Sequence, residues 1–323
     1  MTYSAARRLL RANGCCAACI LWLATLAAVA PAAENGGSVY PAGVETVMPG
    51  MMPGAGQTMF LEFNNFYQAN ATVDGSGHSV IPGFHLRVAA LAPKFVHNWG
   101  IGFLGGELVR SIAMPILYEH LDGPFGKFEK TGNGNADIGV LDVAYSRGPW
   151  HWWYGIDVYL PGFRYDKNAL LNVGQHYFAT APEWAFTYLP RHRATEISSK
   201  FQYVVSATDG ATNYRSGQEF IWEYDAMQNV KGKLAAGASG YYCQQTSDDA
   251  QNGTRIGNRG RVVGVGPELR YHMERAALIL KYQRETLVAN RTRGKFLLCA
   301  NGCPNRAQRR ITPPEKRGDL GDS

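Results

Sequence analysis

Carboxylates at closely spaced positions are the residues of this sequence with the clearest capacity for chemistry. Glu219, Glu223 and Asp225 form one group, and Asp157 and Glu183 are separate acids in similar surroundings. Two carboxyl groups on either side of a sugar ring can act as acid and base, or as acid and nucleophile, in glycoside hydrolysis. Charged side chains that line the wet face of a β-strand have the same spacing, and this simpler interpretation is favoured.

Other reactive patterns are incomplete. The His and Ser residues lack the Gly-x-Ser-x-Gly elbow that positions a hydrolase nucleophile. Gly132-Asn-Gly134 lacks the Lys-Ser/Thr of a phosphate loop and the helix of a dinucleotide site, so a tight turn is favoured. Cys299 and Cys303 lack two further ligands for zinc, although a disulfide bridge between them stays open. We therefore expect no enzyme, no metal and no cofactor.

Charge is concentrated at the two ends of the 323-residue chain. The net charge is +6, with Arg7, Arg8 and Arg11 near the start and a basic segment after Asn290. The stretch between them is close to neutral and contains no basic stripe. This distribution argues against a nucleic-acid partner.

Residues 1–33 are predicted to be a cleaved secretory signal peptide. Three arginines precede an uncharged run from Ala12 to Ala33, and Ala30-Pro-Ala32 provides a small-x-small cleavage site. After this segment no stretch is apolar and long enough for a membrane-spanning helix. The remaining alternatives are a soluble exported protein and a membrane β-barrel.

The body of the chain alternates apolar and polar residues with a period of two. Trp184, Phe186 and Tyr188, for example, alternate with Glu183 and Thr187. Alternation alone fits a soluble sandwich as well as a barrel. The export signal, the aromatic residues near strand ends and the charges of both signs favour an all-β protein, an antiparallel transmembrane β-barrel of about 12 strands. The barrel is predicted over residues 34–298, followed by a basic, disordered tail over 299–323.

The polar faces of these strands are predicted to line the lumen and to form the candidate binding surface. The candidates are Arg87, Asp157, Glu183, Lys200, Glu219, Glu223, Glu268, Arg270, Lys281 and Glu285, with Glu62 as a further lumen residue. An aromatic ligand would also need a stacking or apolar patch at the mouth. Loop residues offered for that role are Tyr165, His176, Tyr177, Phe178 and Tyr214.

The order of several motifs is similar to that of the family named for the meta-pathway of phenol degradation, outer-membrane proteins of Gram-negative bacteria. The pieces are Gly132–Gly139, Asp157–Asp166 with Leu171–Gly174, Asn213–Glu219, Gly240–Gln245, Val265–Tyr271 and Lys281–Glu285. The resemblance covers roughly residues 40–298. It implies an outer-membrane location, insertion by the barrel-assembly machinery, contact with outer-membrane lipid and uptake of small hydrophobic or aromatic molecules. It carries over no catalytic residue.

The C-terminus departs from that family's pattern. Such barrels end on a strand with a terminal aromatic residue, whereas this chain continues past Leu298 into a basic tail, which leaves closure of the sheet an open question. Two alternatives to transport also stay open, namely a structural or adhesive barrel and an exported hydrolase.

Overall fold

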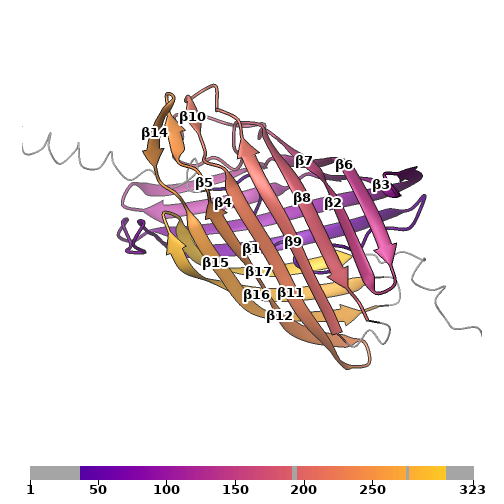
Figure 1. Cartoon of the computed structure of the whole chain (residues 1–323). Coiled ribbons are helices and arrows are strands. Elements are labelled where there is room, and N and C mark those ends of the chain that lie inside the picture. The colour runs from indigo at the N-terminus through magenta and orange to yellow at the C-terminus, as the bar shows by residue number, and fades with distance from the viewer. Residues whose placement is uncertain (1–36, 191–194, 274–275, 303–323) are drawn as a thin grey trace, which may run out of the picture.

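The computed structural model describes residues 37–190, 195–273 and 276–302. The predicted signal peptide and residues 303–323, including Cys303, lie outside the described residues. Within the described part of the chain the regular structure is entirely β-strand (Figure 1). No helix of that part is long and apolar enough to cross a membrane.

One sheet contains fourteen of the strands. Their bounds are β1 Thr58–Thr72, β2 His85–Phe103, β3 Gly106–Ala113, β4 Ile116–Gly123, β5 Gly126–Asn133, β6 Ala136–Arg147, β7 Trp150–Leu160, β8 Ala179–Tyr188, β9 Thr195–Ser206, β11 Glu219–Lys231, β12 Leu234–Gln245, β15 Arg261–His272, β16 Ala277–Ala289 and β17 Thr292–Gly302. A second sheet joins β10 Tyr214–Arg215, β13 Asp249–Gln251 and β14 Thr254–Gly257 in the loops.

The large sheet closes on itself, because β1 pairs with β17 on one side and with β2 on the other. Two pairs of strands are continuous across short breaks. β3 and β4 both pair antiparallel with β2 and are separated only by Met114-Pro115, and β5 and β6 are separated by Gly134-Asn135. Joining them reduces the fourteen strands to a closed, antiparallel, twelve-stranded barrel. The predicted fold class is confirmed.

The two ends of the barrel differ in their connections. At one end short links such as Leu104-Gly105, Gly148-Pro149 and Gly232-Lys233 join the strands, and β1 begins and β17 ends there. At the other end the connections include three long segments, residues 161–178, 207–218 and 246–260, and the last two carry the small second sheet. In outer-membrane barrels the turns are periplasmic and the long loops extracellular. We therefore call these the periplasmic end and the extracellular end.

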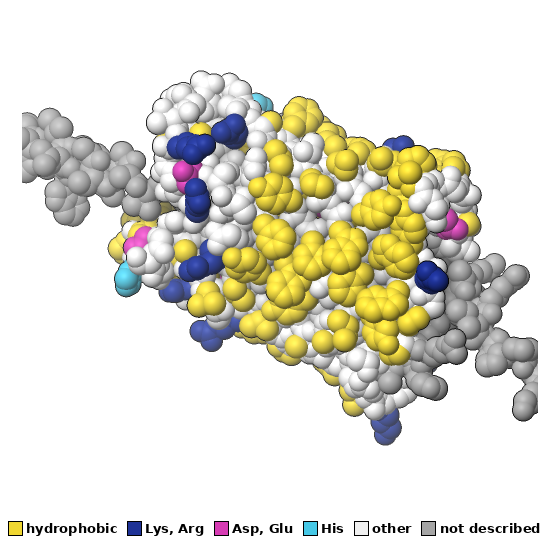
Figure 2. Space-filling model, in the orientation of Figure 1, with side chains coloured by type: hydrophobic (Ala, Val, Ile, Leu, Met, Phe, Trp, Pro, Cys, Tyr) yellow, Lys and Arg dark blue, Asp and Glu magenta, His cyan; other side chains and the backbone are white. Residues whose placement is uncertain are grey.

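The outer surface is apolar and aromatic over the middle of the barrel (Figure 2). Trp184, Phe201 and Trp222 stack side by side across β8, β9 and β11, with ring centroids 5.2 Å and 6.1 Å apart. Their side chains are partly exposed although they are large hydrophobic residues, as expected of a surface that contacts lipid.

On some strands the face that contacts lipid is the opposite of the one predicted. On β1 and β2 the apolar residues Phe63, Tyr67 and Leu86 belong to clusters that include buried residues inside the barrel. Their polar neighbours Glu62 and Arg87 therefore lie on the outer face, and Arg87 is exposed. Both were predicted to line the lumen. That prediction is wrong because the apolar residues of these two strands face the interior of the barrel.

Two further corrections follow from the strand assignments. The last strand continues through Gly302, so Cys299 belongs to the barrel and not to the tail. Some of the aromatic residues near strand ends that favoured a membrane barrel are buried inside it and do not face lipid. These are Trp153, Tyr159 and Tyr241.

Candidate functional site: the barrel interior and its N-terminal segment

Residues 37–57 run through the inside of the barrel from the extracellular end to the periplasmic end, and we call this segment the plug. Ser38 donates a hydrogen bond to Glu219 near the extracellular end of β11. At the other end Nδ2 of Asn98 donates to the carbonyl of Pro53 at 2.8 Å, and the amide of Gly56 donates to the Asn98 carbonyl at 2.9 Å. The plug therefore occupies the lumen along its whole length.

The composition of the plug explains why it is not a strand. Pro41, Pro49 and Pro53 lack an amide donor, and Gly43 has a positive φ of 96°. A Cβ atom at position 43 would lie 2.5 Å from the Tyr241 ring, so only glycine fits there. With no regular partner strand, the plug is held instead by side chains of the barrel wall.

Glu45 is the central contact of the plug. Its Oε1 lies 2.5 Å from Nζ of Lys94 on β2, and its Oε2 lies 2.6 Å from Nζ of Lys200 on β9. Lys200 also lies 2.9 Å from Glu183, and Lys94 lies 3.8 Å from Asp137. One plug carboxylate thus joins two lysines that belong to different walls of the barrel.

A second group of wall residues binds the backbone around Glu45. Nζ of Lys281 donates to the Val44 carbonyl at 2.9 Å and to Oγ1 of Thr46 at 2.8 Å. Glu223 accepts hydrogen bonds from the amide of Gly43 and from the Tyr40 hydroxyl, the latter at 2.8 Å. These contacts satisfy polar groups that would otherwise be buried without a partner.

Towards the periplasmic end a third ion pair supports the plug. Arg270 lies 2.5 Å from Glu196, and Glu196 accepts a hydrogen bond from the Met48 amide at 3.1 Å. The indole of Trp153 donates to the Pro49 carbonyl at 2.6 Å. The plug is therefore anchored at its middle and at both ends.

Nine of the ten predicted lumen candidates lie on the inner face of the barrel, and Arg87 does not. The nine are Asp157, Glu183, Lys200, Glu219, Glu223, Glu268, Arg270, Lys281 and Glu285. Most are engaged with the plug or with one another, and Glu285 accepts hydrogen bonds from Tyr67 and Tyr241 at 2.8 Å each. Whether any of them contacts a transported molecule stays a prediction.

Sequence reasoning missed the partners that complete this network. Glu45, Lys94 and Glu196 were not singled out, and neither was Arg291, which lies 2.7 Å from Glu219. The signal available was the loss of period-two alternation in the Pro- and Gly-containing stretch before β1. A lone acid in such a stretch is a candidate for pairing with lumen lysines.

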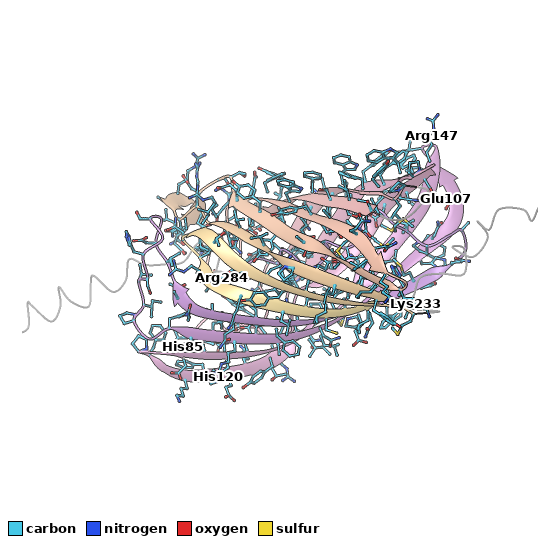
Figure 3. The ribbon with its side chains drawn as sticks, turned by 90° about the horizontal axis from the view of Figure 1, so that it is seen from below. His85, Glu107, His120, Arg147, Lys233 and Arg284 are labelled. Atoms are coloured by element: carbon cyan, nitrogen blue, oxygen red, sulfur yellow. The ribbon has the colours of Figure 1, made fainter. Side chains whose placement is uncertain are left out.

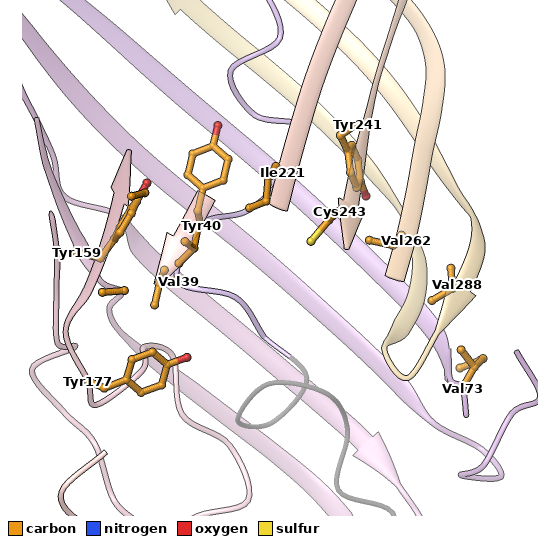
Figure 4. Close-up of a cluster of buried hydrophobic side chains, with 14 residues drawn as sticks. Val39, Tyr40, Val73, Tyr159, Tyr177, Ile221, Tyr241, Cys243, Val262 and Val288 are labelled. Atoms are coloured by element: carbon orange, nitrogen blue, oxygen red, sulfur yellow. The ribbon is translucent and has the colours of Figure 1, made fainter. Parts of the chain in front are cut away.

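The extracellular part of the interior is largely apolar, although the Glu219–Arg291 ion pair lies beside Cys243 there. A cluster of buried side chains from eight strands, two loops and the plug meets there, and we call it the apolar collar (Figure 4). Its members are Val39, Tyr40, Ala71, Val73, Tyr159, Tyr177, Ala179, Ala181, Val204, Ile221, Tyr241, Cys243, Val262 and Val288. Val39 and Tyr40 of the plug fill its centre, and the Tyr40 ring meets Tyr159 edge-on at 6.5 Å.

The periplasmic end contains a large cavity. Its volume is about 1760 Å³, and plug residues 44–54 form one side of it. The wall contributes Leu61, Phe63, Val96 and Leu298 together with polar groups such as Asp142. From the extracellular end inward, the interior therefore passes from the apolar collar to a charged belt around Glu45 and then to this cavity.

The aromatic residues proposed at the mouth have mixed surroundings. Tyr177 and Tyr214 are buried, and Tyr177 belongs to the apolar collar, whereas Phe178 is exposed. Tyr165 stacks on His176 at 4.6 Å, and His176 lies 2.9 Å from the buried carboxylate of Asp209. Tyr177 is thus the member of this set best placed to meet a molecule that enters the collar.

Comparison with solved structures supports the fold. An outer-membrane channel of the COG4313 group from Pseudomonas putida F1 is similar with a TM-score of 0.68 at 12% identity, covering 77% of this chain and 96% of that one. The CymD monoaromatic hydrocarbon channel is similar with a TM-score of 0.44 at 7% identity, covering 83% of this chain and 94% of that one.

A comparison with curated proteins found no matching sequence. A family match covers residues 69–298, which is most of the chain and includes every barrel strand from the end of β1 to the middle of β17. The apolar outer belt, the closed sheet and the long loops at one end place the protein in the outer membrane. This outer-membrane β-barrel belongs to the MetA-pathway of phenol degradation family.

Proposed function

We propose that this barrel is a channel, not an enzyme, that admits small hydrophobic or aromatic molecules through the outer membrane. The observation that carries the proposal is the apolar collar. A barrel whose interior only conducts water and ions has a polar lining. Here Val204, Ile221 and Val262 point inward and pack on the plug instead. Ligand sites for apolar molecules are lined in this way.

The plug gives the channel a closed resting state. Val39 and Tyr40 occupy the place in the collar that an aromatic ligand would take, and the cavity beyond the charged belt opens towards the periplasmic end. A molecule that displaces these two side chains would enter the cavity once the plug shifts. Three of the carboxylates that suggested a glycosidase have other partners: Glu183 pairs with Lys200, whereas Glu219 and Glu223 accept hydrogen bonds from the plug.

Uptake of radiolabelled toluene by intact cells that produce the protein tests the proposal. Val204→Thr combined with Val262→Thr places two hydroxyls in the collar with little change of volume. We expect toluene uptake at low concentration to fall by about fivefold or more, because burying a hydroxyl next to an apolar ligand is unfavourable.

The matched control is Val205→Thr combined with Val265→Thr, which changes the same residue type on the outer face of the same two strands. This control is expected to take up toluene like the unmodified protein. Equal uptake by both double variants and by cells without the protein would contradict the proposal and would favour a structural barrel.

A further inference from the structure

A row of polar and basic residues crosses the outer face of one side of the barrel. Each residue of the row is the pairing partner of the next one on the neighbouring strand. In order the residues are Arg284, Lys295, Gln68, Arg87 and His120. These residues belong to β16, β17, β1, β2 and β4, which are consecutive around the barrel. Arg284, Lys295, Gln68 and Arg87 are all exposed.

The next row towards the periplasmic end is apolar and aromatic. It runs Tyr282, Leu297, Phe66, Ala89 and Tyr118, again as successive partners on the same strands. Two residues along a strand correspond to about 7 Å. Aromatic side chains mark the boundary of the hydrocarbon layer in barrels. The basic row therefore lies just outside that boundary, at the depth of the lipid headgroups.

The cations of this row are not neutralised by the protein itself. Among the described residues, no ion pair joins Arg87, Arg284 or Lys295 to a carboxylate. The acids nearby are Glu129, which is 2.9 Å from His120, and Asp122, which is 3.5 Å from Lys127. Further basic side chains, Arg293 and Lys127, are exposed one row closer to the extracellular end.

The basic row is confined to one side of the barrel. On the opposite wall the outward residues of β8 are Thr180, Pro182, Trp184, Phe186 and Tyr188, none of which is charged. Figure 3 shows Arg284, His85 and His120 towards one end, while Glu107, Arg147 and Lys233 lie towards the other. A general requirement of the membrane interface would affect all walls alike, so the asymmetry indicates a specific site.

We propose that Arg87, Arg284 and Lys295 bind the phosphates of lipid A, the glycolipid of the outer leaflet of the outer membrane. Three cations at headgroup depth complement the two phosphates on the glucosamine disaccharide, and arginine suits phosphate because its guanidinium forms paired hydrogen bonds. The acyl chains of the same molecule would lie against Tyr282, Phe66 and Tyr118 directly below. One lipid A molecule would thus be held across the β1–β17 junction that closes the barrel.

The test measures lipid A binding to the purified, detergent-solubilised full-length protein by native mass spectrometry. The variant Arg87→Gln/Arg284→Gln/Lys295→Gln is expected to bind bis-phosphorylated lipid A at least about tenfold more weakly, because each cation near an anionic headgroup contributes on the order of 1 kcal/mol. Monophosphoryl lipid A should bind the unmodified protein more weakly than the bis-phosphorylated form. Phosphatidylglycerol and inorganic phosphate should compete poorly.

The control Arg147→Gln/Lys231→Gln/Lys233→Gln removes three exposed cations at the periplasmic end and should leave binding within about twofold. Heat-modifiable gel migration verifies that each variant is folded. If the triple variant does not fold, Arg284→Gln and Lys295→Gln are measured singly and should each weaken binding by about fivefold. Unchanged binding in the folded variants, an equal loss in the control, or equal competition by phosphatidylglycerol or inorganic phosphate would overturn the proposal.

Discussion

Oε2 of Glu45 lies 2.6 Å from Nζ of Lys200, so an acid of the N-terminal segment pairs with a lysine on β9 that is 155 positions later in the chain. The same carboxylate contacts Lys94 at 2.5 Å. All three side chains are largely removed from solvent, which makes the attraction between them strong and an unpaired member costly. Through these two ion pairs Glu45 attaches the plug to two walls of the barrel, in addition to the hydrogen bonds that hold the plug elsewhere.

Glu45→Gln is expected to release the plug. The change leaves Lys94 without its nearest carboxylate and Lys200 with only Glu183. Removing one partner of a buried ion pair lowers stability by roughly 3–5 kcal/mol. Single-channel recordings in planar bilayers should show a higher conductance or more frequent opening. Glu62→Gln on the outer face of β1 is the control, and identical traces for both variants would show that Glu45 does not hold the plug.

Tyr40→Ala is expected to open the apolar collar without releasing the plug. The ring fills the centre of the collar against Tyr159, and its hydroxyl donates to Glu223 at 2.8 Å. Removing it leaves space for an aromatic ligand while the Glu45 contacts persist. Toluene uptake should rise several-fold, whereas swelling of liposomes in arabinose should not change. A parallel rise for the sugar would mean that the variant has lost the plug altogether.

The twelve strands could be predicted from the sequence because each inner or outer face has its own chemistry. On β8 the outward Trp184, Phe186 and Tyr188 and the inward Glu183 and Thr187 lie as expected. The prediction of faces failed on β1 and β2, since a lumen filled by a plug needs apolar contacts as well as polar ones. Phe63 and Tyr67 therefore point inward, and Arg87 points out.

The candidate site was predictable only in part. Charged strand residues such as Lys200 and Lys281 were identified as lining the lumen by their period-two positions, and the structure places them there. The plug was not predicted, because its contacts to the wall join residues far apart in sequence. No local pattern records that Thr46 receives a hydrogen bond from Lys281, 235 positions away.

Gly264→Ala is expected to destabilise the barrel. Gly264 faces Tyr241 across the β12–β15 ladder, and a Cβ atom there would lie 2.2 Å from Cε1 of that ring. Displacing the ring also strains the hydrogen bond from the Tyr241 hydroxyl to Glu285. Overpacking of this kind costs about 1–3 kcal/mol. The temperature at which the folded band disappears in a heat-modifiability gel should fall by several degrees.

Gly210→Ala is the matched control for this glycine, because a Cβ atom at position 210 would meet nothing within 4 Å. Its unfolding temperature should equal that of the unmodified protein. A Gly264→Ala protein as stable as this control would mean that Tyr241 can turn away at no cost.

The extracellular loop around Asp209 is expected to loosen only in acid. Burial alone would raise the pKa of Asp209, but hydrogen bonds from His176 and from the Ala211 amide outweigh it and hold that pKa below the ordinary 3.8. A carboxylate with a lowered pKa stabilises the folded loop above its ordinary pKa, and the contribution is lost as the pH falls through the folded value.

Hydrogen exchange of the Ala211 amide, corrected for intrinsic rate, should therefore be constant between pH 7 and about pH 5 and should increase below about pH 4. Asp209→Asn removes the titrating group and should exchange at a rate that does not depend on pH in this range. Loosening of the unmodified loop already between pH 7 and 5 would assign the switch to another group.

Asn135→Ala is expected to free the loop of residues 161–178 from the barrel wall. Asn135 lies in the break between β5 and β6, where Nδ2 donates to the carbonyls of Leu160 and Gln175 at 2.9 Å and 3.1 Å and Oδ1 accepts from the Gln175 amide at 2.8 Å. Alanine removes all three of these hydrogen bonds, while the Gln175 carbonyl keeps the one from the Gly162 amide at 2.9 Å. Since each hydrogen bond contributes about 0.5–1.5 kcal/mol, the loop should open more often.

Limited trypsin digestion reports this opening, because Arg164 and Lys167 lie in the loop. Cleavage there should be at least about tenfold faster in Asn135→Ala than in the unmodified protein. A tenfold change corresponds to a decrease of about 1.4 kcal/mol in the free energy of local opening, when that opening limits proteolysis. The loop of residues 246–260, which carries Arg255 and Arg259, provides the internal control and should be cut at an unchanged rate. Faster cleavage of both loops would indicate that Asn135 stabilises the whole extracellular end, and not the one loop that it contacts.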